Sequence, residues 1–254
     1  MYFITLTAYA AFIGSLLLHF KANVLWVMLF LSMVPVSILW YQEKLASRLV
    51  PIIIAAAIVL TTFLEVVAYI NGLWYELSPF SLRVFGLFPL ESFVAAFVHI
   101  LFFIVVYEYF FDDRKTTGRV HPDHAPFLLA GAGGLLSVAL AYVYVFSGVF
   151  FSYPFALLIL LLFVLFVVAI AMTRTDWRQL CLKTLMFAVS ILPFSLVYEY
   201  IALANDLRFF ANTQEYLYTL NFFGQMVPLE EIVFILIVPF WLATTYELYL
   251  DDGK

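Results

Sequence analysis

The chain has 254 residues, of which 66% are hydrophobic and 11% are charged; its formal net charge is −5 and its mean hydropathy is +1.06. A soluble domain is usually about 25% charged, so the composition excludes an ordinary soluble protein. It predicts an all-α, polytopic membrane protein, because helices satisfy their backbone polar groups within lipid. The single cysteine, Cys181, excludes an intramolecular disulfide and a cysteine-based metal site.

Apolar runs along the chain predict about eight transmembrane helices, since about 20 apolar residues cross a bilayer. The runs cover 2–19, 24–41, 49–70, 88–111, 127–148, 152–172, 181–203 and 227–250. Some runs are short and the break near Gly148 is slight, so counts of seven and nine are alternatives. With eight spans, nine Lys and Arg residues fall on one side of the membrane and three on the other. By the positive-inside rule, this predicts a multi-pass protein of the cell membrane with both termini in the cytoplasm.

The two long connections on the outer side, 71–87 and 204–226, are rich in polar and aromatic residues. We expect them to lie in the membrane interface as partial helices or lids. Each leads into a helix that opens with proline, Pro89 or Pro228, and proline is favoured in the first turn of a helix.

An internal repeat relates the two halves of the sequence. The tripeptide Pro-Leu-Glu at 89–91 opens the fourth predicted helix and recurs 139 positions later, at 228–230, where it opens the eighth. The repeat predicts two four-helix domains, 1–120 and 121–254. Because four is an even number, the two repeats have the same orientation and are related by an axis along the membrane normal.

Five glutamates are the candidate catalytic residues, because charges at membrane depth are costly and usually functional. They are Glu65, Glu91, Glu199, Glu230 and Glu231. All fall at outer helix ends, where the repeat brings them to one level. Neighbouring carboxylates in apolar surroundings can act as one acid and one base, which suits proton delivery to an apolar substrate without a cofactor or a metal. The alternative is that glutamates in a first helical turn only stabilise the helix end.

The histidines give weaker signals. His99 lies eight residues after Glu91, and so on nearly the same face of the fourth helix. A packed, hydrogen-bonded role is favoured for it over a proton relay. His121 and His124 flank Asp123 in a predicted cytoplasmic loop, where a solvated loop is favoured over a metal site.

Both halves resemble a known family. Glu65, the Asn-Gly-Leu-Trp run at 71–74, Gly86 and the Pro-Leu-Glu start at 89–91 resemble the membrane-embedded lycopene cyclases of the heterodimeric and fused type. These enzymes occur in actinobacteria, Bacteroidetes, archaea and fungi. In the second half, Pro-Leu-Glu-Glu at 228–231 resembles the acidic helix start of the family's second domain. The first half has Ser92 where the family usually has a second acid.

The resemblance implies an isomerase of carotenoid biosynthesis that cyclises the linear ends of lycopene without redox change. A carboxylic acid would protonate the terminal double bond, the carbocation would close a six-membered ring, and a carboxylate would remove a proton. Glu230 and Glu231 are then the expected catalytic pair, assisted by Glu91, Glu65 and Glu199.

Two other functions stay open at this point. One is a related isoprenoid hydratase, in which water quenches the same cation. The other is a non-catalytic membrane protein: a carotenoid or lipid binder, an assembly subunit or a small transporter. The expected partners are an apolar polyene or isoprenoid and membrane lipid, with no nucleic acid; a homo-oligomer is left open.

Overall fold

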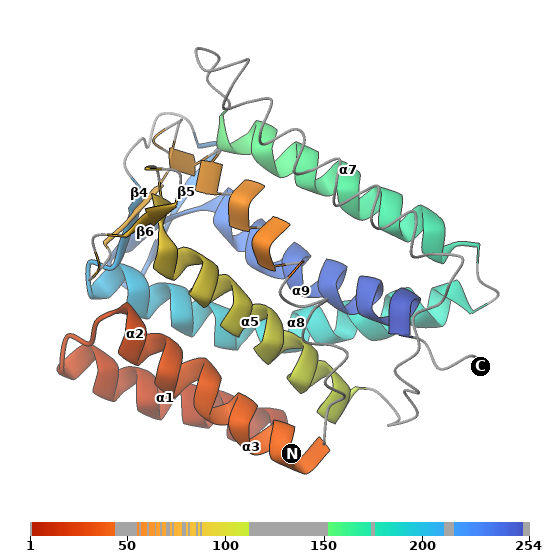
Figure 1. Ribbon diagram of the computed structural model, residues 1–254, viewed down its shortest axis with the longest axis horizontal. Coiled ribbons are helices and arrows are strands. Elements are labelled where there is room, and N and C mark those ends of the chain that lie inside the picture. Colours follow the sequence, from red (N-terminus) through yellow and green to blue (C-terminus); the bar gives the residue numbers. More distant parts are fainter. Residues whose placement is uncertain are drawn as a thin grey trace.

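The fold is that of a computed structural model, and it is mostly helical. It describes residues 2–43, 55, 57–59, 61–63, 65–66, 68–69, 72, 74–77, 80, 82–84, 86, 88–111, 152–173, 176–210 and 216–250. The expected helical class is confirmed, with the addition of short strands at one end of the bundle (Figure 1).

The described helices follow the apolar runs closely. They are α1 (Tyr2–His19), α2 (Val24–Val27), the π-helical η1 (Met28–Met33), α3 (Val34–Glu43), α5 (Leu90–Phe110), α7 (Tyr153–Ala171), α8 (Trp177–Ala204) and α9 (Leu229–Leu250). The segments α2, η1 and α3 continue one another. Within the described part, five helical stretches are long and apolar enough to cross a membrane, and α1 adds a shorter apolar helix.

Two of the eight expected spans are not fully described. In the run 49–70, the described residues between 55 and 69 are helical apart from short gaps, and Glu65 is among them. The run 127–148 lies outside the described residues. The chain is therefore a helical membrane protein, while the number eight stays a prediction.

The helices pack side by side, and α5, α8 and α9 form the centre of the bundle (Figure 1). Aromatic side chains fill the α5–α8 contact, where the rings of Phe102 and Phe194 stack with centroids 4.3 Å apart. Helices α5 and α9 both begin at the strand end and run in the same direction (Figure 1). The first residue of α1 and the last residues of α9 lie toward the opposite end of the bundle.

Within their described residues, the two outer connections contain short strands, where the sequence led us to expect partial helices or lids. In the first, β1 is Trp74–Glu76, and β2 (Arg83–Val84) pairs with β3 (Phe88–Pro89). In the second, β4 is Arg208–Phe210, and β5 (Thr219–Phe222) pairs with β6 (Gln225–Pro228).

A tight turn explains the second hairpin. Phe223 and Gly224 join β5 to β6, and both have positive φ, at 49° and 88°. Two successive residues with positive φ are typical of the two-residue turns that connect antiparallel strands. Phe-Gly is a weak signal for such a turn, since Asn-Gly and Asp-Gly are the usual pairs, and the sequence analysis missed it.

The strands β1 and β4 pair antiparallel and so join the two outer connections at one end of the bundle (Figure 1). Their register places Trp74 opposite Phe210, Tyr75 opposite Phe209, and Glu76 opposite Arg208. The pair forms a lid over the ends of the central helices. It also brings a cation from the second connection next to an anion from the first.

Candidate functional site

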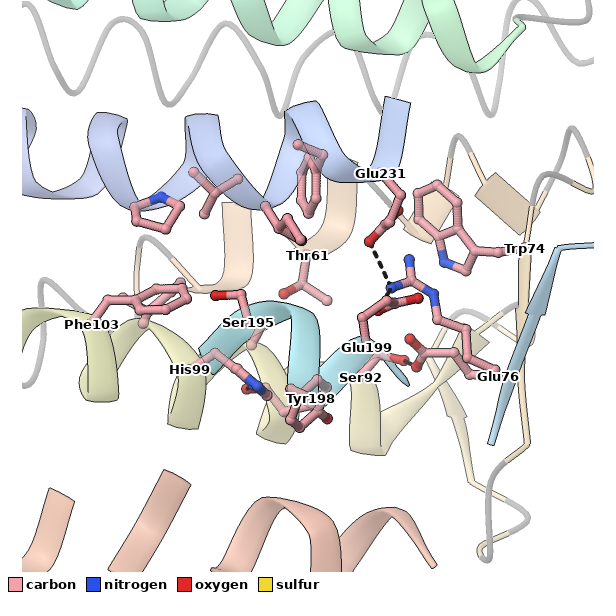
Figure 2. A pocket seen from close by; sticks show the side chains of 18 of the residues that line it. Thr61, Trp74, Glu76, Ser92, His99, Phe103, Ser195, Tyr198, Glu199 and Glu231 are labelled. Carbon is pink, nitrogen blue, oxygen red and sulfur yellow. Dashed lines mark hydrogen bonds and ion pairs between the residues drawn. The ribbon is translucent and has the colours of Figure 1, made fainter. Parts of the chain in front are cut away.

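A cavity of about 190 Å3 lies next to the β1–β4 pair, among α5, α8 and α9 (Figure 2). Its lining differs between its two ends. The end near the strands is polar and includes Glu65, Glu76, Ser92, Glu199, Arg208 and Glu231. The remaining walls are mainly apolar and include Ala95, Ile100, Phe103, Phe194, Phe234 and Val238. A molecule in this cavity would meet ionisable groups at one end and hydrocarbon at the other.

Arg208, the first residue of β4, connects two carboxylates of the second half. Its Nη1 donates to Glu199 Oε2 at 3.1 Å and to Glu231 Oε1 at 3.0 Å. Its guanidinium carbon lies 4.9 Å from the centroid of the Trp74 ring. Burial alone would lower the pKa of the guanidinium, but the negative charges of Glu199, Glu231 and Glu76 hold it well above its ordinary value. Arg208 is therefore a permanent positive charge inside the protein.

Tyr153, the first residue of α7, fixes the other oxygen of Glu231. Its hydroxyl donates to Glu231 Oε2, while Arg208 contacts Oε1. The Tyr153 ring packs against Trp74, with centroids 5.2 Å apart, and against Tyr216 at 6.0 Å. Glu231 is 0% exposed. With a partner on each oxygen, this carboxylate has a single orientation.

The first half contributes a different arrangement to the same cavity. Glu76 Oε2 accepts a hydrogen bond of 2.8 Å from the Ser92 hydroxyl. Ser92 holds the position that Glu231 holds in the second half. Glu65 also lines the cavity, close enough to Glu76 and Arg208 for their charges to act on it. Each half therefore contributes two carboxyl groups to the cavity: those of the second half contact a guanidinium, and Glu76 of the first half contacts a hydroxyl.

His99 lies farther from the strands, on α5 (Figure 2). Its Nδ1 is 2.7 Å from the carbonyl oxygen of Ala95. A carbonyl can only accept, so Nδ1 carries the hydrogen, and in the neutral ring Nε2 is left as an acceptor. Nε2 has no hydrogen-bond partner within the described part of the chain. The ring meets Tyr198 edge-on, with centroids 4.2 Å apart.

Glu91 and Glu230 have a different task from Glu231. Each accepts a backbone N–H of the preceding connection: Glu91 Oε1 from Phe80 at 3.0 Å, and Glu230 Oε1 from Leu217 at 2.6 Å. Neither residue belongs to the described lining of the large cavity. These two glutamates therefore hold the hairpins to the starts of α5 and α9. The adjacent residues Glu230 and Glu231 therefore have different hydrogen-bond partners.

The five glutamates expected from sequence are thus divided between two places. Glu65, Glu199 and Glu231 line the cavity, whereas Glu91 and Glu230 anchor the connections above it. Arg208, Tyr153 and Glu76 are not among the site residues expected from the sequence. Arg208 is one of the three Lys and Arg residues on the predicted outer side of the membrane. The one signal for its contact with Glu199 is the spacing: the two residues are nine positions apart, on either side of the end of α8.

The cavity has an unbalanced set of charges. Four carboxyl groups (Glu65, Glu76, Glu199 and Glu231) surround a single guanidinium. In apolar surroundings one cation does not balance four anions, so ionising all four groups together is costly. A group of carboxyls that shares protons can both donate and accept them. The arrangement suits acid–base chemistry on a bound apolar molecule.

Metal binding is not favoured by the residues that the structure describes. Among them, no group of three or more His, Cys, Asp or Glu residues is arranged to hold a metal ion. His121, Asp123 and His124 lie outside the described residues.

Comparisons of the chain with protein-family models, curated proteins and solved structures give no match.

Proposed function

We propose that this protein is a carotenoid cyclase of the lycopene type, which isomerises a membrane-dissolved polyene by proton transfer and without redox change. One observation carries the proposal: carboxyl groups from both halves of the chain meet at one end of a cavity whose other walls are apolar and aromatic. Such a cavity suits a substrate that has no polar group and needs only a proton added and a proton removed.

The two halves of the chain favour a division of labour. Glu199 and Glu231 both contact Arg208, and Glu231 is also held by Tyr153, so we place the base that removes the proton on this side of the cavity. The donor then comes from the first half of the chain, whose Glu65 also lines the cavity. We assign the acid role to Glu65 and the base role to Glu231, with Arg208 and Tyr153 as positioning residues for Glu231.

The aromatic lining supports a cationic intermediate. Trp74, Phe103 and Phe194 line the cavity, and the faces of aromatic rings attract cations. The apolar walls would also keep bulk water from the carbocation and so prevent its capture as an alcohol. This feature favours cyclisation over hydration.

The finer architecture belongs to the same proposal. We infer eight spans in two parallel halves, 1–120 and 121–254, with both termini in the cytoplasm. The parallel course of α5 and α9 supports this, since equivalent helices of parallel repeats run in the same direction (Figure 1). The β1–β4 pair supports it as well, because it lies between the two halves.

Expression in lycopene-accumulating cells tests the proposal. The expected product is a monocyclic or bicyclic carotenoid with the mass of lycopene, and Glu231→Gln should abolish it. A product heavier by one water would identify a hydratase instead. Unchanged lycopene from a well-expressed, membrane-inserted protein would contradict catalysis, and polyene absorbance that co-purifies without turnover would indicate a binder.

A further inference from the structure

A second, smaller cavity of about 40 Å3 lies beside the first. Its walls include Leu77 and Glu91, and Leu77 is 55% exposed, so this cavity reaches the protein surface near the strands. A polar space of this size is large enough for a water molecule. The two cavities share three lining residues, which form a partition between them: Glu76, Tyr198 and Arg208.

Glu76 is the carboxyl group of this partition. The pKa of Arg208 lies well above its ordinary value, because nearby carboxylates offset the effect of burial. A phenol such as Tyr198 has an ordinary pKa of about 10, whereas that of a glutamate is about 4.3. Of these three side chains, the carboxyl group is the kind from which proton relays within membranes are built.

The surroundings of Glu76 connect it to the buried acids. Ser92 of α5 donates to one of its oxygens, and Arg208 faces it across the strand pair. Its charge acts on Glu65 of the helical segment before β1 and on Glu199 of α8. Glu91, on α5, is the ionisable group on the other side, in the smaller cavity.

A buried acceptor lies beyond the partition. Glu199 is 4% exposed and lines the large cavity, and its Oε1 has no hydrogen-bond partner within the described residues. Its other oxygen contacts Arg208. An unpartnered carboxylate oxygen at this depth is costly. Proton transfer from the partition, directly or through water, would remove the buried negative charge.

We propose that Glu76 carries protons between water in the smaller cavity and the carboxyl groups of the large one. In one direction, the Glu76 carboxylate takes a proton from a hydronium ion or water at the surface and passes it to a buried carboxylate. In the other, it accepts the proton of a buried carboxylic acid and releases it to water. No other reactant is required, and the path does not depend on which reaction the site performs.

The path has a clear use if the proposed function holds. An isomerisation that takes its proton from one carboxyl group and returns it to another leaves both in the wrong state after each turnover. Exchange through Glu76 would reset them with solvent protons. This purpose depends on the proposed function, but the exchange itself can be measured in the absence of any substrate.

Infrared spectroscopy of the purified protein in phosphatidylcholine nanodiscs tests the path. After transfer to D2O, the C=O stretching band of buried carboxylic acids shifts as their protons exchange. We expect Glu76→Gln to slow this exchange by at least roughly tenfold. A glutamine still offers an oxygen to the Ser92 hydroxyl, so the local hydrogen bond is preserved.

Glu247→Gln is the matched control, because it removes the same charge at the far end of α9, where Glu247 contacts Lys183 and Tyr107. Its exchange rate should equal that of the wild type.

Ala202→Leu, which fills the smaller cavity and leaves Glu76 in place, should slow exchange as Glu76→Gln does. Equal rates in the wild type and Glu76→Gln, or no exchangeable carboxyl band in the wild type, would overturn the proposal. Neither result bears on the lycopene assay.

Discussion

Tyr75 and Phe209 face each other across the β1–β4 pair, and they are 134 positions apart in the chain. Glu65 and Glu199, which line the cavity beside them, are separated by the same number. An antiparallel pair that is centred on two equivalent residues is what a twofold axis between two repeats would produce. The proposed axis would then pass between Tyr75 and Phe209, and the cavity lies next to it.

Replacing Arg208 tests the ion cluster. Arg208→Ala would leave Glu199 and Glu231 buried without their cation, and breaking a buried ion pair usually costs about 3–5 kcal/mol. We expect a much lower thermal midpoint in detergent and no conversion of lycopene. Arg208→Lys should recover part of both, because one nitrogen, Nη1, makes both contacts and an ammonium group could do the same. An Arg208→Ala protein as stable as the wild type would contradict the contacts of Arg208 with Glu199 and Glu231.

The two adjacent glutamates at the start of α9 should respond differently to the same substitution. In Glu230→Gln, the new amide oxygen can still accept the Leu217 N–H, so we expect stable protein and most of the activity. In Glu231→Gln, the negative charge between Arg208 and Tyr153 is lost, and we expect no product. Conversion of lycopene by both variants, expressed at equal levels, is the measurement. Equal loss of activity in the two would restore the view that they act as a pair.

Much of the helical framework could be predicted from the sequence, because long apolar runs leave few alternatives. The run 88–111 became α5 (Leu90–Phe110), and the run 227–250 became α9 (Leu229–Leu250). The strands could not be predicted in the same way. They are two to four residues long, and β1 is paired with a strand more than 130 residues away, so no local pattern marks it.

The candidate site could be predicted only in part from the sequence. Matched Pro-Leu-Glu starts marked Glu91 and Glu230, but these residues bind backbone N–H groups of the connections. Which glutamate of a first helical turn points into the bundle depends on the orientation of the helix, and sequence does not give that. The role of Arg208 depends on the β1–β4 register, which brings a loop cation over the cavity.

Tyr153→Phe tests how far the orientation of Glu231 matters. The variant keeps the ring that packs on Trp74 and Tyr216 and removes only the hydroxyl that donates to Glu231. Losing a hydrogen bond to a buried charged group costs about 1.5–3 kcal/mol. We expect a lower thermal midpoint and reduced, but measurable, cyclisation. Tyr200→Phe is the control, since it removes the same hydroxyl from a ring that packs on Phe222 and Phe223; a loss as large as that of Tyr153→Phe would show that the Glu231 contact is not responsible.

Asn205 joins the end of α8 to the turn that follows α1. Its Nδ2 donates to the carbonyl oxygens of Leu17 and Ala22, at 3.2 and 3.1 Å. We expect Asn205→Ala to lower the free energy of unfolding by about 1–3 kcal/mol, because buried carbonyls would lose a donor. Thermal unfolding in detergent measures the change. Asn221→Ala, which removes a hydrogen bond to Gly224 in an exposed hairpin turn, should have a smaller effect, and the reverse order would contradict this role for Asn205.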